Sequence, residues 1–464
     1  MTHVQDITSP MSSVERRATL SLSSIYALRM LGLFMIFPVL SLFAETLEGS
    51  TPLLIGLAIS VYGLTQAVLQ IPFGLMSDRF GRKKIIVIGL LLFASGSIVA
   101  ALSTTIYGVL IGRALQGSGA IAAAIMALVA DLTREVHRTK AMALIGASIG
   151  ISFGVAMTLG PVISGFSGIQ GIFWVTAVLS FLAIFVVLFV VPNPVQTKVH
   201  GDAELIPAKF STVLKDKNLL RLDYGIFTLH LILTASFVIV PLLLRDAGLI
   251  PEDHWQVYLP LLTTSMAMII PFVIIAEKKR KMKAVFVGAV ATLVLADLSL
   301  FYFNDSLYTL IAGLWVFFCG FNLLEATLPS LISKTAPGNL KGTAMGAYSS
   351  AQFFGAFLGG TTGGWIYGEY GANYVFLFCA VAAGLWLIVA LFMNAPQYLA
   401  NLLVSTDDIA ADKLADFLAD ILTVTGVASA DFQSSENVVY LKVDNAQLDK
   451  DKLQYLLTQW SGSV

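Results

Sequence analysis

Long apolar runs separated by short polar connections fill the chain up to residue 395. A helix needs about 20 predominantly apolar residues to cross the hydrocarbon core of a bilayer, and twelve such runs follow one another here. The pattern therefore predicts an all-α polytopic membrane protein with twelve transmembrane helices. The spans are expected at residues 19–43, 54–77, 85–103, 106–131, 140–165, 171–191, 220–244, 256–276, 284–303, 307–333, 342–367 and 373–393.

The pattern changes after Pro396, where the chain becomes acidic and short elements replace the long apolar runs. Helical and alternating patterns follow one another in the order βαββα. This order predicts a small α/β domain and fits a ferredoxin-like unit that lacks its last strand. The strands are expected at 399–404, 427–433 and 437–443, and the helices at 407–422 and 447–459.

The apolar part contains an internal repeat. A Pro-Phe pair followed by one acidic and two basic residues occurs twice, 199 positions apart. Transporters are often built from duplicated halves, so we expect two six-helix halves. The two copies are Pro72, Phe73, Asp78, Arg82 and Lys84, and Pro271, Phe272, Glu277, Lys281 and Lys283. The expected units are an N-terminal half at 1–192, a cytoplasmic linker at 193–217, a C-terminal half at 218–395 and the small domain at 396–464.

Positive charge is distributed unevenly over the connections. The even-numbered connections, the N-terminal arm and the central linker hold 21 of the 28 Lys and Arg residues, whereas the odd-numbered connections hold only Arg245. Short cytoplasmic loops retain Lys and Arg, so both termini are expected in the cytoplasm.

The amino-acid composition limits the classes of function that the chain can have. Of the 464 residues 57% are hydrophobic and 12% are charged, against roughly a quarter charged in soluble domains. The net charge of −1 argues against a nucleic-acid partner. Both cysteines, Cys319 and Cys379, lie in apolar runs, and the ATP-binding Gly-x-x-x-x-Gly-Lys sequence is absent. We therefore expect no enzyme activity, metal site or cofactor.

The connection after the second span has a distinctive pattern. It reads Gly-Leu-Met-Ser-Asp-Arg-Phe-Gly-Arg-Lys-Lys over residues 74–84. Gly74 lets helices approach closely, Gly81 permits a tight turn, and Asp78 is suited to the positive N-terminus of another helix. A plain cytoplasmic cluster of basic residues would explain the lysines and arginines but not the glycines and the aspartate.

This connection resembles the signature of the major facilitator superfamily, Gly-x-Leu-x-Asp-Arg-x-Gly-Arg-Lys/Arg, with Met76 in place of its leucine. The resemblance implies that Asp78 faces the start of the eleventh span near Gly342 and that Arg82 reaches Asp131. It identifies a conformational switch loop comprising Gly74, Asp78, Arg79, Gly81, Arg82, Lys83 and Asp131.

The fourth span contains Arg113-Ala-Leu-Gln116-Gly-Ser-Gly119, which is similar to the family's Arg-x-x-Gln-Gly-x-Gly element. Arg113 lies roughly 10 Å inside its helix, where desolvating a guanidinium costs several kcal/mol unless polar groups or water surround it. Arg29 and Gln116 are candidate neighbours in a cavity. The alternative is an arginine that braces helices through backbone carbonyls.

The fifth span contains Gly150, Gly154 and the pair Gly160-Pro161. Small residues four positions apart permit close helix packing, and a proline kinks or stiffens a helix. The segment resembles the antiporter motif Gly-x-x-x-Gly-Pro, with Ala156 in place of its first glycine. The resemblance implies export with proton exchange, and generic helix packing explains the glycines nearly as well.

Three ionisable residues interrupt the apolar spans of the second half: His230, Asp297 and Glu325. His230 and Glu325 both lie roughly 12–15 Å from the cytoplasmic ends of their helices, whereas Asp297 lies nearer the opposite face. A carboxylate beside an imidazole can exchange a proton in the physiological range. Asn322 lies one turn before Glu325 on the same face. The alternative is a neutral pair that locks two helices together.

Residues 15–395 as a whole resemble the drug:proton antiporter branch of the superfamily, and the acidic tail resembles a bacterial group with a ferredoxin-like domain after span twelve. The resemblance implies a proton-coupled exporter of amphipathic small molecules in the inner membrane, which works by alternating access. Two alternatives remain open: a membrane receptor or regulator whose tail signals to a partner, and a solute importer.

Overall fold

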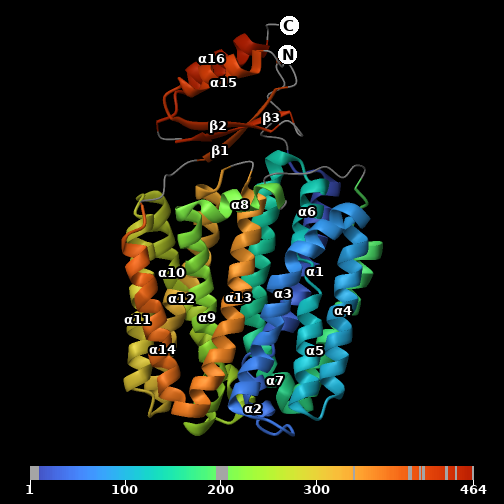
Figure 1. Ribbon diagram of the computed structural model, residues 1–464, viewed down its shortest axis with the longest axis vertical. Helices are drawn as coiled ribbons and strands as arrows, with labels where there is room; N and C mark the ends of the chain where they lie inside the picture. The colour runs from blue at the N-terminus through green and yellow to red at the C-terminus, as the bar shows by residue number, and fades with distance from the viewer. Residues whose placement is uncertain are drawn as a thin grey trace.

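A bundle of long helices carries a small α/β unit on one of its ends (Figure 1). The computed structural model describes residues 10–194, 207–337, 340–394, 400–406, 409, 413–433, 437–444 and 447–461. We refer to the end of the bundle beside the α/β unit as the tail end, and to the opposite end as the far end.

The first six expected spans are present. They are formed by α1 (Ser13–Phe34), α2 (Leu40–Ala44), α3 (Pro52–Phe80), α4 (Arg82–Leu102), α5 (Ile106–Ser118), α6 (Ala122–Leu132) and α7 (Glu135–Phe189).

Two of these spans are interrupted where the sequence predicted continuous helices. The break between α1 and α2 contains Pro38, which has no N–H with which to continue a helix. The break between α5 and α6 begins at Gly119, whose ψ of 56° is not helical. These breaks free backbone carbonyls inside the bundle for side-chain donors.

Helix α7 contains both the fifth and the sixth span. Its 55 residues would form a rod of roughly 80 Å, whereas the hydrocarbon core is about 30 Å thick. Gly168 has φ 63° and ψ −173°, a conformation that favours glycine. The chain turns at this residue, so α7 crosses the membrane twice.

The second half supplies spans seven to twelve. After α8 (Pro207–Lys215) these are α9 (Lys217–Asp246), the 3-10 turn η1 (Pro251–Asp253) with α10 (Trp255–Lys278), α11 (Met282–Tyr302), α12 (Leu307–Thr335), α13 (Lys341–Tyr370) and α14 (Ala372–Leu391). The predicted twelve-helix fold in two halves is confirmed.

By length and composition, nine helical stretches of the described chain qualify as membrane spans. The stretch 140–189 among them holds Gly168 and supplies two spans. The other two spans are α1 with α2, where Arg29 interrupts the apolar run, and α13, which is rich in Gly, Ser and Thr.

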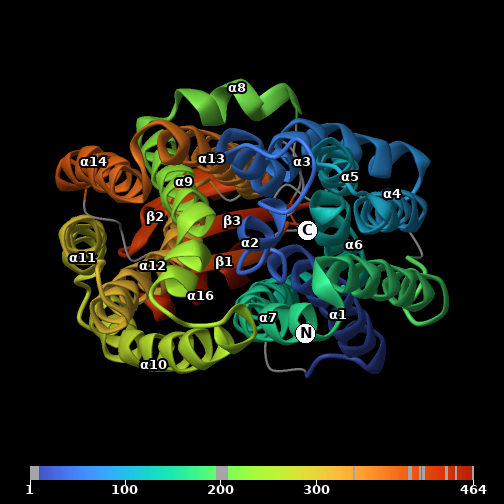
Figure 2. The same cartoon turned by 90° about the horizontal axis from the view of Figure 1, so that it is seen from below.

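The two halves meet along α3 and α13, which lie side by side at the edge of the bundle next to α8 (Figure 2). Glycines make this approach possible: a Cβ on Gly364 would lie 2.9 Å from the Cα of Gly56. Helices α7 and α10 form a further contact between the halves at the opposite edge (Figure 2). The halves therefore meet on two sides of the bundle.

The tail contains β1 (Ala400–Ser405), α15 (Leu414–Leu422), β2 (Val427–Gln433), β3 (Val438–Val443) and α16 (Lys450–Ser461). The sheet has the order β1-β3-β2 with both pairs antiparallel, and Phe417, Ile421 and Leu441 form its buried core with other apolar residues. The predicted βαββα order is confirmed. Of the predicted first helix, residues 407, 408 and 410–412 lie outside the described residues.

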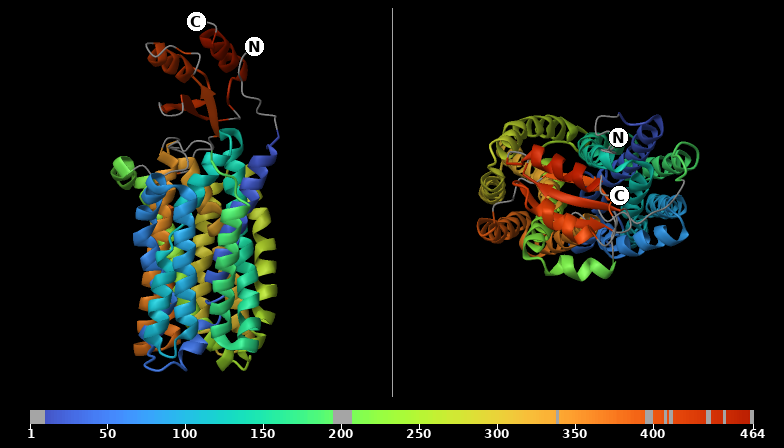
Figure 3. Two further views of the ribbon diagram at one scale, coloured as in Figure 1. Left: turned by 90° about the vertical axis from the view of Figure 1, so that its right-hand side faces the viewer. Right: turned by 90° about the horizontal axis from the view of Figure 1, so that it is seen from above.

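The tail contacts the C-terminal half of the bundle (Figure 3). The Lys442 ammonium donates hydrogen bonds to the carbonyl oxygens of Lys334 (2.8 Å), Thr335 (3.4 Å) and Ala336 (2.6 Å) at the end of α12. Arg280 forms an ion pair of 2.6 Å with Asp444. Lys442 therefore satisfies carbonyls that the last turn of a helix leaves without partners.

Candidate functional site

The predicted switch loop is a hydrogen-bonded network centred on Arg82. Gly81, at φ 100°, ends α3 and starts α4. The Arg82 guanidinium then bonds Asp131 Oδ2 at 3.2 Å, Ser77 Oγ at 3.0 Å and the carboxylate of Asp78. The predicted contact between Arg82 and Asp131 is confirmed.

Two further residues of the predicted loop lie outside this network. The Arg79 guanidinium lies 5.5 Å from the ring centroid of Phe80. The Lys83 ammonium donates to the carbonyl oxygen of Val191, at the end of α7, at 2.6 Å. Both residues serve local contacts at the tail end.

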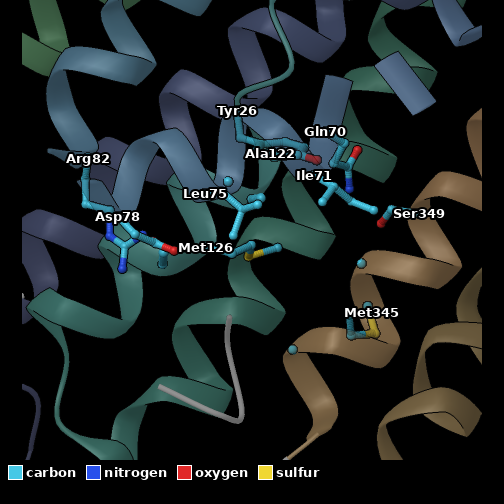
Figure 4. Close-up of a pocket in the computed structure, with 15 residues that line it drawn as sticks. Tyr26, Gln70, Ile71, Leu75, Asp78, Arg82, Ala122, Met126, Met345 and Ser349 are labelled. Atoms are coloured by element: carbon cyan, nitrogen blue, oxygen red, sulfur yellow. The ribbon is translucent and has the colours of Figure 1, made fainter. Parts of the chain in front are cut away.

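A pocket beside this network separates the two halves at the tail end (Figure 4). Asp78, Arg82 and Gly74 line it on the side of the N-terminal half, and Gly342 and Ser349 of α13 line it on the other side. Asp78 and the first turn of α13 therefore border one pocket, as expected. The Asp78 side chain is 36% exposed and pairs with Arg82.

At the far end the halves are in direct contact. The Ser60 and Thr361 hydroxyls are 3.1 Å apart, which joins α3 to α13. Arg245 and Glu45 form an ion pair of 2.5 Å between the halves. The two halves thus touch at the far end, whereas the pocket lined by Asp78 and Gly342 lies between them at the tail end.

Arg113 braces helices. It is fully buried, and its guanidinium donates to the carbonyl oxygens of Ala58 (3.2 Å) and Ile59 (3.1 Å) and to Gln116 Oε1 (2.8 Å). It also lies 5.2 Å from the Tyr62 ring centroid. The expectation that Arg113 and Gln116 face a cavity is not met in this structure, because the carbonyls of α3 satisfy the guanidinium.

Arg29 is also buried on the N-terminal side. It donates to Tyr62 Oη at 2.7 Å, Gln66 Oε1 at 2.6 Å and the Gly119 carbonyl at 3.0 Å. The break between α5 and α6 takes that carbonyl out of the regular hydrogen bonding of a helix, and it accepts from the Ile121 N–H at 2.9 Å as well. Arg29 therefore joins α1, α3 and the break, and it does not line the pocket.

His230 and Glu325 are brought together, as their depths predicted. His230 Nε2 lies 4.0 Å from Glu325 Oε2 and 2.8 Å from Gln352 Nε2 on α13. The Glu325 side chain is 36% exposed, whereas that of His230 is 13% exposed. A carboxyl group so placed can exchange a proton with the imidazole or with a bound molecule.

Two polar residues of the second half lie apart from this pair. Asn322 donates to Ser265 Oγ at 2.9 Å and so joins α12 to α10. Asp297 is fully buried in α11, and among the described residues neither of its carboxyl oxygens has a hydrogen-bond partner.

The glycine motif of the fifth span divides into two parts. A Cβ on Gly160 would overlap the carbonyl of Met35, so Gly160, followed by Pro161, packs α7 closely against the first span. A Cβ on Gly150 or Gly154 would meet no atom of the described residues within 4 Å. The packing role predicted for these two glycines is wrong in this conformer, because they face open space.

Sequence reasoning missed Gln66, Gln352, Tyr348 and Asp223. Each lies inside an apolar span and is at most partly exposed. Asp223 could have been found, because it is an ionisable residue within the apolar run 220–244. The residue types of the two glutamines and the tyrosine give no such signal.

A family model described as Major Facilitator Superfamily matches residues 22–360 and 254–407. The chain belongs to this superfamily. It is a multi-pass membrane transporter and not an enzyme.

The Inner membrane transport protein YajR of Escherichia coli (strain K12) is 46% identical to it over 97% of this chain and 99% of that protein. Multidrug resistance protein 2 of Bacillus subtilis (strain 168) is 27% identical over 78% of this chain and 90% of that protein. The crystal structure of the human organic anion transporter MFSD10 aligns with 82% of this chain and over 100% of the MFSD10 chain. The TM-score is 0.62 at 19% sequence identity, which shows the same fold.

Proposed function

We propose that the chain is a proton-coupled secondary transporter that exports amphipathic small molecules by alternating access. The observation that carries this proposal is the pair of His230 and Glu325, whose nitrogen and oxygen are 4.0 Å apart within the bundle. An ionised carboxylate inside a membrane protein costs several kcal/mol unless it is paired or wetted. Binding a proton removes that charge, so protonation can decide which conformers the transporter adopts.

The pair suits an exchange of substrate for a proton. The Oε2 atom of Glu325 is buried toward His230, while the side chain as a whole is 36% exposed. One face of the carboxyl group is thus available to a bound molecule. A carboxyl group that both a proton and a bound molecule can reach can couple the movement of one to that of the other, which is the requirement for antiport.

The pocket at the tail end supports amphipathic substrates. Ile71, Leu75 and Met345 supply apolar walls, and Gln70 and Ser349 supply hydrogen-bonding groups. Binding sites for small molecules commonly combine apolar walls with a few polar groups. The named function of the Bacillus subtilis relative, multidrug resistance, is consistent with this chemistry.

The Arg82 network is the proposed switch between conformers. Asp78 and Gly342 face the same pocket, so closing the tail end brings the carboxylate toward the N-terminus of α13. That attraction is worth about 0.3–1 kcal/mol when exposed and up to about 2 kcal/mol when partly buried. Arg82 and Asp131 hold Asp78 in place for it.

We propose that the tail end faces the cytoplasm of a bacterium and that the chain lies in the inner membrane. The basic connections at 79–84 and 278–283 support this orientation, as does the name of the Escherichia coli relative. The proposed units are the two halves at 1–192 and 218–395, the linker at 193–217 and a ferredoxin-like domain at 396–464. The split βαβ arrangement of the β1-β3-β2 sheet supports the last assignment.

Flux through proteoliposomes tests the proposed function. The full chain is reconstituted, a pH gradient is imposed, and movement of the fluorescent amphipathic cation ethidium is followed together with internal pH. We expect gradient-driven ethidium movement coupled to proton counterflow, which Glu325→Gln abolishes. Glu369→Gln, an exposed site on α13, is the matched control and should retain it. Equal coupled flux in Glu325→Gln and Glu369→Gln would contradict the assignment.

A further inference from the structure

Four buried polar atoms without hydrogen-bond partners gather where α9, α12 and α13 meet. Among the described residues these are Asp223 Oδ1, Tyr348 Oη, Glu325 Oε2 and His230 Nδ1. A buried polar group without a partner destabilises the fold, so such groups are rare unless they have a function. Two of the four groups belong to the proposed proton site, and Asp223 and Tyr348 have no role in it so far.

The four residues are ordered by depth from the tail end. Asp223 and Tyr348 follow the starts of α9 and α13 by six and seven residues, which is roughly 10 Å. Glu325 precedes the end of α12 by ten residues, roughly 15 Å. His230 follows the start of α9 by thirteen residues, roughly 20 Å. The series therefore leads from near the tail end to the pair.

Helix periodicity turns these side chains toward one another. Asp223 and His230 are seven residues apart on α9, two turns on one face. Tyr348 and Gln352 are one turn apart on α13, and Gln352 is hydrogen-bonded to His230 at 2.8 Å. The Tyr348 oxygen lies within electrostatic range of both the Asp223 and the Glu325 carboxyl groups. Tyr348 thus interacts electrostatically with both acids.

We propose that Asp223 and Tyr348 form the proton route between the tail end and the pair of Glu325 and His230. The inference rests on the proposed function: export releases the Glu325 proton to the cytoplasm along this route, and a drop in pH at the tail end drives the same transfers in the opposite direction. Asp223, with 7% of its surface exposed, takes a proton from the aqueous phase and becomes a neutral acid. The Tyr348 oxygen accepts that proton as its own hydroxyl proton passes to the Glu325 carboxylate. Each transfer forms one O–H bond and breaks one, so Asp223 ends as a carboxylate, Tyr348 is unchanged and Glu325 is neutral.

Bridging waters complete the route. Within the described part of the chain none of the four atoms has a hydrogen-bond partner, and proton transfer needs either direct hydrogen-bond reach or one water between the groups. The titratable groups that face the route are Asp223 and His230 from α9, Glu325 from α12 and Tyr348 from α13.

The test measures protonation of Glu325 without any substrate. The full chain in lipid nanodiscs is subjected to a rapid drop in pH, and the infrared C=O stretch of protonated carboxyl groups is followed in time. The component that Glu325→Gln removes reports Glu325. We expect Tyr348→Phe to slow the growth of this component roughly 100-fold, the scale of a lost proton-transfer group, with an unchanged final amplitude. Asp223→Asn should slow it as well.

Two control variants make the result specific. Tyr367→Phe makes the same change on the same helix near the far end, and Asp305→Asn changes an exposed aspartate at that end. Both should retain the wild-type rate. Wild-type rates in Tyr348→Phe and Asp223→Asn, with the component still lost in Glu325→Gln, would overturn the route and leave the proton site standing. If Glu325→Gln removes no component, the proton site and the route both fail.

Discussion

Replacement of Gly364 by alanine should open the far end of the bundle. Gly364 lies on α13 where this helix meets α3, and a Cβ there would lie 2.9 Å from the Cα of Gly56 and 2.5 Å from the carbonyl oxygen of Pro52. Non-bonded carbon atoms prefer a separation of about 3.5–4.0 Å, so the two helices must move apart by roughly 1 Å.

The cost of this movement falls on one conformer. Overpacking a close contact costs about 1–3 kcal/mol, and the contact at Gly364 exists only while the far end is closed. The helix preference of alanine over glycine acts on both conformers and cancels. A difference of about 1–3 kcal/mol shifts a two-state equilibrium about 5- to 150-fold. The variant should therefore populate the conformer with an open far end.

Labelling of a cysteine at Ser60 measures this population. Ser60 is 2% exposed beside α13, so Ser60→Cys, in a chain with Cys319 and Cys379 replaced by serine, should react slowly with a bulky water-soluble maleimide. Gly364→Ala should increase the labelling rate, whereas Gly384→Ala, where a Cβ meets no atom within 4 Å, should not. Equal labelling rates in the two alanine variants would refute the argument that the α3–α13 contact is a gate.

Three further predictions concern stability and the tail. Lys442→Gln should release the tail from α12, seen as faster hydrogen exchange in the tail sheet, whereas Lys450→Gln should not; unchanged exchange in Lys442→Gln would contradict the clamp. Arg113→Lys should lower the free energy of unfolding by about 2 kcal/mol or more, since a lysine cannot replace the guanidinium at three acceptors; unchanged thermal stability would argue against bracing. Burial raises the pKa of Glu15, but hydrogen bonds, chiefly from Arg134, outweigh it and lower the pKa from 4.5 to about 2. The stabilisation from Glu15 is therefore present above pH 4.5 and lost as the pH falls toward 2, and Glu15→Gln should remove this part of the acid sensitivity in a pH series of melting curves.

The spans and the tail elements could be predicted because hydrophobic length and periodicity determine them locally. The breaks at Pro38 and Gly119 could not, because both lie in runs apolar enough to read as single helices. Gly119 shows why this matters: the break takes the Gly119 carbonyl out of the regular helix hydrogen bonding, and Arg29 donates to it. The partner of a buried arginine depends on where another helix happens to break.

Depth along a helix predicted the meeting of His230 and Glu325, since residue counts give depth directly. Counting does not give rotation about the helix axis. Arg113 was therefore expected in a cavity, although its helix turns it toward the carbonyls of α3. The contact of Lys442 with α12 also escaped prediction, because it joins residues more than 100 positions apart with no shared pattern.

Comparing exchange with net flux in Glu325→Gln tests the central claim most directly. Glutamine keeps the shape of the side chain but cannot change its charge. In proteoliposomes with ethidium on both sides, we predict that the variant still exchanges labelled for unlabelled ethidium, at wild-type thermal stability, while an imposed pH gradient drives no net movement. Gradient-driven net flux at the wild-type rate in this variant would contradict the account.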